Sequence, residues 1–312
     1  MDFTQVILQI AVLFIIMFLG YDLRRRNIIS EDGVKNYSSL IFYVTMPALI
    51  ISSMANTSLK KASDLGQIVI ASLISYTFFI LVSLVIPRLL KVEDGSKGLF
   101  KFMTIFGNAG FIGFPMLVAI LDESAVFLGA VLNIPFNVLL FSLGVYYIVS
   151  DKGHGHKMKL SFKQFMNPGL IATIIGVGVI LSGIGLPSLV LRVASTLGAV
   201  TTPVAMIVVG ASLCGVNSKE MIKNYRIFIL SGIRMLIFPL VVGLILRMIN
   251  LDGMIIAVAM VIAGMPIGTT TVIMARQYDG NVLEASEAVF ISTVLLIVTA
   301  PFLVMMIQLI AR

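Results

Sequence analysis

The sequence predicts an all-α integral membrane protein with ten transmembrane helices. Hydrophobic residues make up 59% of the chain, charged residues only 12%, and the mean hydropathy is +1.06. A soluble domain carries about 25% charged residues, so the composition excludes that class. The apolar residues also gather in stretches near the ~20 residues that a helix needs to cross the hydrocarbon core. We predict helices at residues 4–22, 34–57, 66–87, 98–121, 124–149, 168–186, 187–215, 225–249, 253–275 and 284–310.

Two of these assignments need a separate argument: the first helix and the boundary between the sixth and the seventh. The first stretch has no basic residues ahead of it and is followed by Arg24, Arg25 and Arg26. This pattern predicts an anchor that keeps its N-terminus outside, because a cleaved signal peptide begins with a basic region. Only Gly185-Leu186-Pro187 separates the sixth stretch from the seventh, and we interpret it as a turn.

The basic residues predict the orientation in the membrane. With the N-terminus outside, the inside gaps hold 16 Lys and Arg residues, and the outside gaps and the C-terminus hold 5. Short loops rich in Lys and Arg stay in the cytoplasm, so both termini are predicted to be extracytoplasmic. The net charge of +7 is therefore a topology signal and does not indicate nucleic-acid binding.

Ten helices divide into two sets of five, which predicts two inverted repeats, because an odd number reverses the second set. Val44-Thr45-Met46-Pro47 in the second stretch matches Val200-Thr201-Thr202-Pro203 in the seventh. Ala125-Val126-Phe127 in the fifth likewise matches Ala288-Val289-Phe290 in the tenth. The predicted division is a first repeat at 1–150, a short cytoplasmic linker at 151–167 and a second repeat at 168–312.

Both repeats contain a helix with Gly and Pro in its middle. These are the fourth stretch at 107–115 and the ninth at 263–271. Interruptions free backbone N–H and C=O groups at a depth where lipid cannot bond them, so they must be buried in protein or line a cavity. A matching pair, one in each half, is the best sequence indication of a transporter's binding site. The alternative for either one alone is a kink relieved by local waters.

Several polar groups join these interruptions as candidates. Asn108 offers amide donors and an acceptor, and Asn133 and Asn137 share one helix face. Arg234 is a mid-membrane charge that pairs either with an anionic substrate or with freed backbone carbonyls. The predicted substrate-binding residues are Asn108, Gly110, Gly113, Pro115, Asn133, Asn137, Arg234, Gly264, Pro266, Gly268, Thr269 and Thr270.

These features predict a secondary transporter for a small organic anion. Half-helix N-termini offer N–H donors, Arg234 is positive, and no Asp or Glu lies clearly within the hydrocarbon. Motifs of intramembrane enzymes are absent, and both His154 and His156 fall in the linker without the other ligands of a metal site. We therefore predict no enzyme activity, cofactor or metal. The coupling ion stays open between Na⁺ and H⁺. The alternatives are a channel, a receptor-like protein, or a carrier of a neutral or cationic solute.

The chain resembles bacterial members of the auxin efflux carrier family, which is related to the bile-acid:sodium symporters. The resemblance is carried by 107–115 in the fourth stretch, by Gly264-Met265-Pro266 through Ala275-Arg276-Gln277-Tyr278 in the ninth, and by Asn167-Pro168. It implies a plasma-membrane transporter whose fourth and ninth helices cross at their prolines, here Pro115 and Pro266.

The resemblance also implies an arrangement in space and a class of substrate. Helices 1, 2, 6 and 7 would form a scaffold, and helices 3–5 and 8–10 a moving transport domain, often in a homodimer. Bacterial relatives are associated with malate and other small organic anions. The long central loop that plant auxin carriers commonly have is missing here, so auxin itself does not follow.

Overall fold

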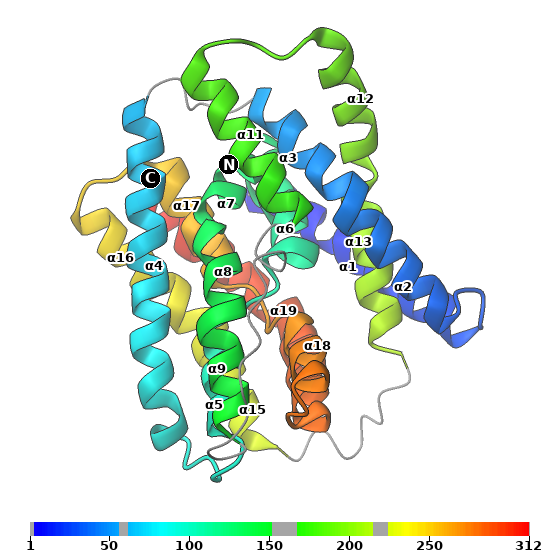
Figure 1. The fold of residues 1–312 in the computed structure, drawn as a ribbon, viewed down its shortest axis with the longest axis vertical. Helices are drawn as coiled ribbons and strands as arrows, with labels where there is room; N and C mark the ends of the chain where they lie inside the picture. Colours follow the sequence, from blue (N-terminus) through cyan, green and yellow to red (C-terminus); the bar gives the residue numbers. More distant parts are fainter. Residues whose placement is uncertain (1–2, 56–61, 152–166, 215–223, 312) are drawn as a thin grey trace.

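The computed structural model describes residues 3–55, 62–151, 167–214 and 224–311, and those residues fold as helices (Figure 1). The first half contains α1 (Phe3–Arg25), α2 (Glu31–Leu40), η1 (Ile41–Thr45), α3 (Met46–Ala55), α4 (Ala62–Leu89), α5 (Lys97–Ile105), η2 (Ala109–Gly113), α6 (Phe114–Ile120), α7 (Ser124–Leu132), α8 (Ile134–Leu139), η3 (Leu140–Gly144) and α9 (Val145–Ser150). The second half contains α11 (Pro168–Ser182), α12 (Ser188–Ala199), α13 (Thr201–Ser212), α15 (Tyr225–Gly232), η4 (Ile233–Ile237), α16 (Phe238–Met248), α17 (Gly253–Ala263), α18 (Thr270–Gln277) and α19 (Val282–Ile310). Most of the predicted linker, including both histidines, lies outside the described residues.

Seven helices within the described residues are long and apolar enough to cross a membrane. They are Phe3–Arg25, Glu31–Ala55, Leu65–Leu89, Ser124–Ser150, Ser188–Ser212, Tyr225–Met248 and Val282–Ile310. Of the other three predicted helices, two are the interrupted ones, and the third, α11, ends at Ser182 and has only 15 residues. The structure thus supports a multi-pass membrane protein, whereas ten crossings and an inverted repeat remain predictions.

The exposed surface of α1 explains how such a chain sits in lipid. Leu8, Ile15 and Phe18 are each more than 60% exposed. A contiguous apolar surface of this kind is costly in water and favourable against acyl chains. On its other side, α1 packs against α13 so closely that a Cβ at Gly20 or Gly210 would collide with the backbone of the partner helix.

In the described part of the chain, three of the four π-helical turns lie just ahead of a proline. The turns η1, η2 and η4 end two residues before Pro47, Pro115 and Pro239. A proline ring clashes with the carbonyl four residues earlier and offers no N–H to bond it. A wider turn at that point accommodates the ring without ending the helix. These prolines therefore reshape their helices locally.

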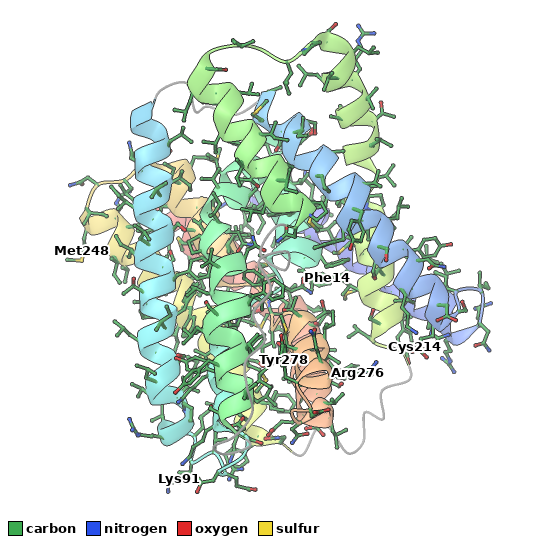
Figure 2. All side chains as sticks on the ribbon, viewed as in Figure 1. Phe14, Lys91, Cys214, Met248, Arg276 and Tyr278 are labelled. Atoms are coloured by element: carbon green, nitrogen blue, oxygen red, sulfur yellow. The ribbon has the colours of Figure 1, made fainter. Side chains whose placement is uncertain are left out.

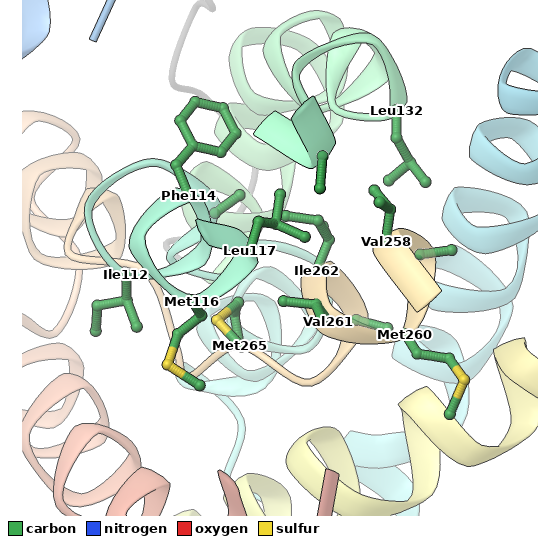
Figure 3. Close-up of a cluster of buried hydrophobic side chains, with 14 of the residues drawn as sticks. Ile112, Phe114, Met116, Leu117, Leu132, Val258, Met260, Val261, Ile262 and Met265 are labelled. Carbon is green, nitrogen blue, oxygen red and sulfur yellow. The ribbon is translucent and has the colours of Figure 1, made fainter. Parts of the chain in front are cut away.

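The buried centre of the molecule is the pairing of the two interrupted segments. Helix α17 is buried continuously from Ile255 to Ala263. Figure 3 shows Val261, Ile262 and Met265 packed among side chains from the fourth segment, such as Met116 and Leu117. Both segments are thereby held in the core and away from lipid, as interrupted helices require.

The positions of the two chain ends can be followed in Figure 1. Both terminus labels lie in the upper half of Figure 1. Lys91 and Arg276, which the charge pattern places in the cytoplasm, lie in the lower half of the same view in Figure 2, as does Cys214 at the end of the seventh segment. The identity of the two membrane sides stays a prediction.

Candidate substrate site at the crossover

The two interrupted segments are joined to each other by backbone hydrogen bonds. Helix α5 ends at Ile105 and α17 ends at Ala263, and the chain is non-helical for a few residues beyond each. There the N–H of Asn108 donates to the carbonyl of Pro266 at 2.8 Å, and the N–H of Gly268 donates to the carbonyl of Phe106 at 3.0 Å. These bonds form an isolated antiparallel bridge between Gly107 and Ile267. Each interruption thus satisfies backbone groups that the other has freed.

The position of Pro115 differs from the expectation that both helices cross at their prolines. Pro266 accepts a bond of the crossover, but Pro115 lies in the first turn of α6, beyond η2. The π-helical turn η2 accommodates the ring of Pro115, so the half-helix that begins at Ala109 continues through it. The interruption therefore falls ahead of Pro115, at the Gly107-Asn108 step.

Arg234 lies directly behind the crossover and is only 1% exposed. Its Nε donates to the carbonyl of Met265 at 3.1 Å, and its Nη1 donates to the carbonyl of Thr104. The guanidinium carbon is 5.8 Å from the ring centre of Phe79 and 6.0 Å from that of Phe238. Of the two predicted roles, these contacts correspond to bonding of freed carbonyls.

Gly107 separates Arg234 from the space in front of the crossover. A Cβ at this position would collide with Nη2 of Arg234, so only glycine lets the backbone come this close to the guanidinium. The positive charge consequently lies just behind the wall that Gly107 provides.

A cavity of about 110 Å³ lies in front of this wall, and Gly107 is part of its lining. The predicted site residues that line it are Asn108, Gly110, Asn133, Asn137, Gly268, Thr269 and Thr270. Those that do not are Gly113, Pro115, Arg234, Gly264 and Pro266. Members of the second set shape or support the crossover: Gly113 faces Ile262 and Met265, and Gly264 faces Leu303.

The amide of Asn108 has a donor side without a hydrogen-bond partner among the described residues. Its Oδ1 accepts from the N–H of Phe111 at 3.2 Å and so caps the half-helix of η2 and α6. Because a backbone N–H can only donate, this bond fixes which end of the amide is the oxygen. The Nδ2 of Asn108 is buried and has no partner among the described residues. It is an unsatisfied donor of a residue that lines the cavity, and such a group is costly unless something bonds it.

Two further asparagines are fixed in the same way. Asn167 caps α11, because its Oδ1 accepts from the N–H of Leu170 at 2.9 Å. Its Nδ2 then donates to Oδ1 of Asn137 at 2.5 Å, which leaves the Nδ2 of Asn137 without a described partner. Both residues line the cavity. The hydroxyl of Tyr76 donates to Oδ1 of Asn133 at 2.6 Å. This bond uses the oxygen of the Asn133 amide and leaves its Nδ2 donors for another partner.

Asn167 is a site residue that the sequence did not reveal. The Asn-Pro pair indicated a helix start, since Asn caps a helix and Pro suits its first turn. It gave no indication that this start lies beside Asn137 at the crossover cavity. The apolar lining residues Met46, Phe111 and Phe136 were missed too, because an apolar residue in a membrane helix is unremarkable.

A second cavity of about 320 Å³ lies along α13, α18 and α19. Its lining is mostly apolar and includes the hydroxyl-bearing residues Ser38, Ser212, Thr269, Ser286 and Thr293. Phe111 and Thr269 line both cavities. These two residues thus mark the place where the cavities are adjacent.

Comparison with known proteins identifies the class of the chain. A family model described as membrane transport protein matches residues 5–304. An uncharacterized transporter of Methanothermobacter thermautotrophicus is 24% identical, covering 96% of this chain and 97% of its own. The uncharacterized transporter MJ1031 of Methanocaldococcus jannaschii is 23% identical (91% and 93%), and YfdV of Escherichia coli K12 is 19% identical (93% and 93%).

The match spans nearly the whole chain, and the relatives are named as transporters and not as enzymes. Together with the interrupted, paired helices, it shows that this chain belongs to the membrane transport protein family, that of the auxin efflux carriers.

Proposed function

We propose that this transporter moves a small organic anion, a carboxylate such as malate, by alternating access at the crossover of its fourth and ninth segments. The observation that carries the proposal is the orientation of the cavity asparagines. The oxygens of Asn108, Asn133 and Asn137 accept bonds from the protein, which leaves their Nδ2 donors for a ligand. A cavity that offers donors suits a ligand rich in acceptors, and a carboxylate supplies up to four acceptor positions.

The electrostatics of the cavity favour the same class of ligand. The half-helices that begin at Ala109 and at Thr270 start at its wall, and helix N-termini carry a partial positive charge. Arg234 adds a full positive charge behind Gly107. Among the described lining residues there is no Asp or Glu that would attract a cation.

The size of the cavity favours a small ligand. Pockets for drug-sized molecules measure roughly 300–1,000 Å³, whereas this one measures about 110 Å³. A compact carboxylate therefore fits better than an indole ring, and transport of auxin is not part of the proposal.

We propose the division into scaffold and transport domain from the helix packing and from the sequence. Helix α1 packs on α13 through glycines, and α3 packs on α11 and α12, which supports a scaffold of segments 1, 2, 6 and 7. Segments 3–5 and 8–10 would form the transport domain, in two inverted repeats with both termini extracytoplasmic in the plasma membrane. The family resemblance adds a homodimer, which light scattering of the purified protein would test.

A thermal-shift panel on the purified protein tests the substrate class. It contains malate, other dicarboxylates, short monocarboxylates, indole acetate, amino acids, and neutral and cationic solutes, each at two pH values and with or without Na⁺. A ligand that binds only the folded state raises its stability by mass action. We expect stabilisation by a small carboxylate. Stabilisation by cationic or neutral solutes alone would overturn the assignment.

A further inference from the structure

The crossover contains a place that is electrostatically suited to a cation, on the opposite side of the bridge from the substrate cavity. The carbonyl of Thr104 belongs to the last turn of α5, and that of Met265 follows the end of α17. The last carbonyls of a helix lack an intrahelical partner and carry the negative end of its dipole. Where interrupted helices meet in secondary transporters, such carbonyl ends are typical ligands of a coupling Na⁺.

In this protein the carbonyls of Thr104 and Met265 are bonded by Arg234, a residue from a third segment. The guanidinium donates to one oxygen from Nη1 and to the other from Nε, so one planar group spans the ends of both half-helices. No carboxylate of the described residues forms an ion pair with it. Its charge is instead balanced by the carbonyl dipoles and by the faces of Phe79 and Phe238.

We propose that Arg234 is the resident cation of the crossover, covalently tethered in the position that a soluble Na⁺ would otherwise occupy. This inference goes beyond the proposed function, because it holds whatever the substrate is. A fully buried charge is expensive unless it is bonded on several sides, and here two carbonyls and two rings provide those contacts. The crossover is then assembled permanently and needs no Na⁺ to hold the two half-helices together.

The variant Arg234→Ala should bind free guanidinium ion at the crossover. Removal of the side chain leaves the carbonyls of Thr104 and Met265 facing an empty space of the size of a guanidinium, beside the stacked rings of Phe79 and Phe238. Free guanidinium ion has the shape and the donors to occupy that space. It should therefore stabilise the variant at millimolar concentrations, far below those at which it denatures proteins.

The test is the melting temperature of the full-length protein in detergent, which requires no substrate. Wild type is measured in NaCl, KCl and choline chloride at equal ionic strength, and Arg234→Ala is measured over a series of low guanidinium concentrations. Arg226→Ala is the matched control, since it removes an arginine of the same segment that is bonded to exposed Glu93. Arg234→Lys keeps the charge but cannot span both carbonyls in one plane.

We expect equal melting temperatures for wild type in the three salts. Arg234→Ala should melt lower, and guanidinium should raise its melting temperature in a saturable way but not that of Arg226→Ala. If Arg234→Ala is recovered only when guanidinium is present during purification, that recovery is the same positive result. Arg234→Lys should fold with an intermediate melting temperature.

Three results would overturn the proposal. The first is Na⁺-specific stabilisation of the wild type. The second is an equal response of both alanine variants to guanidinium, and the third is a failure of guanidinium to restore either the stability or the recovery of Arg234→Ala. A failure to find any carboxylate ligand would leave this proposal standing while refuting the proposed substrate class.

Discussion

The backbone N–H of Asn108 donates to the carbonyl of Pro266 at 2.8 Å, and this bond is one of two that link the interrupted segments. The side chain of the same asparagine, which lines the cavity, caps the half-helix that follows, and its Nδ2 is buried without a described partner. The backbone of Asn108 therefore helps to hold the crossover together, and its side-chain amide belongs to the cavity lining. A substitution of its side chain can change binding while the bond to Pro266 remains.

Replacement of Asn108 by Asp separates these roles. The carboxylate can still accept from the N–H of Phe111, so the helix cap persists, but the donors are lost and a negative charge enters the cavity. A hydrogen bond to a charged ligand contributes about 1.5–3 kcal/mol, so carboxylate affinity should fall at least about 10- to 100-fold. Binding titrations and melting temperatures of Asn108→Asp and wild type measure both effects.

The control for this variant is Asn108→Ala, which loses the cap as well as the donors. It should cost about 1 kcal/mol of stability in addition to the affinity, since that is typical of a lost N-cap. Unchanged carboxylate affinity in both variants would show that the Nδ2 of Asn108 does not contact the substrate.

Substitution of Gly107 by Ala should damage the crossover itself. The new methyl group collides with Nη2 of Arg234, whose position is fixed by its carbonyl partners. Overpacking of this kind costs about 1–3 kcal/mol. Gly232→Ala, in the same segment as Arg234 but with open space around the added methyl group, is the matched control and should melt near wild type. Equal melting temperatures for the two variants would contradict the close approach.

Loss of the Asn167 side chain should weaken binding indirectly. Asn167→Ala frees Oδ1 of Asn137, which then adds an acceptor to a cavity that should offer donors. It also removes the cap of α11. In a double-mutant cycle with Asn137→Ala, the two effects on carboxylate affinity should be less than additive, because the residues are bonded. Strict additivity would mean that the two amides act independently.

The predicted topology is tested by finding on which side of the membrane the C-terminus lies. A tag added after Arg312 should react with an impermeant reagent in intact cells, because the charge bias of 16 to 5 favours extracytoplasmic ends. A tag between Asp151 and Asn167 should react only after the cells are opened. The reverse pattern would exclude the predicted orientation.

The sequence was sufficient to locate the two interruptions, but it did not show which groups bond the carbonyls that they free. Gly and Pro at 107–115 and 263–271 predict a loss of regular helix, and the structure interrupts both segments there. The partners of Arg234 could not be predicted, because Thr104 and Met265 come together only when three segments pack.

The donor-rich cavity was only partly predictable for the same reason. Asn108, Asn133 and Asn137 stand out as amides in apolar helices, which are costly to leave unpaired. The free end of each amide is decided by contacts with Phe111, Tyr76 and Asn167, and tertiary packing sets those contacts. The position of the interruption relative to Pro115 was also missed, because a wider turn ahead of a proline lets a helix continue through it.

The most direct measurement is counterflow in proteoliposomes. Vesicles loaded with an unlabelled carboxylate that stabilises the protein are diluted into the same labelled carboxylate, with wild type and Asn108→Asp compared at equal reconstitution. We predict transient, saturable accumulation of label by wild type and a much smaller accumulation by Asn108→Asp. Flux that does not saturate and shows no counterflow would identify a channel. Counterflow of equal size in both proteins would place the substrate away from the crossover cavity.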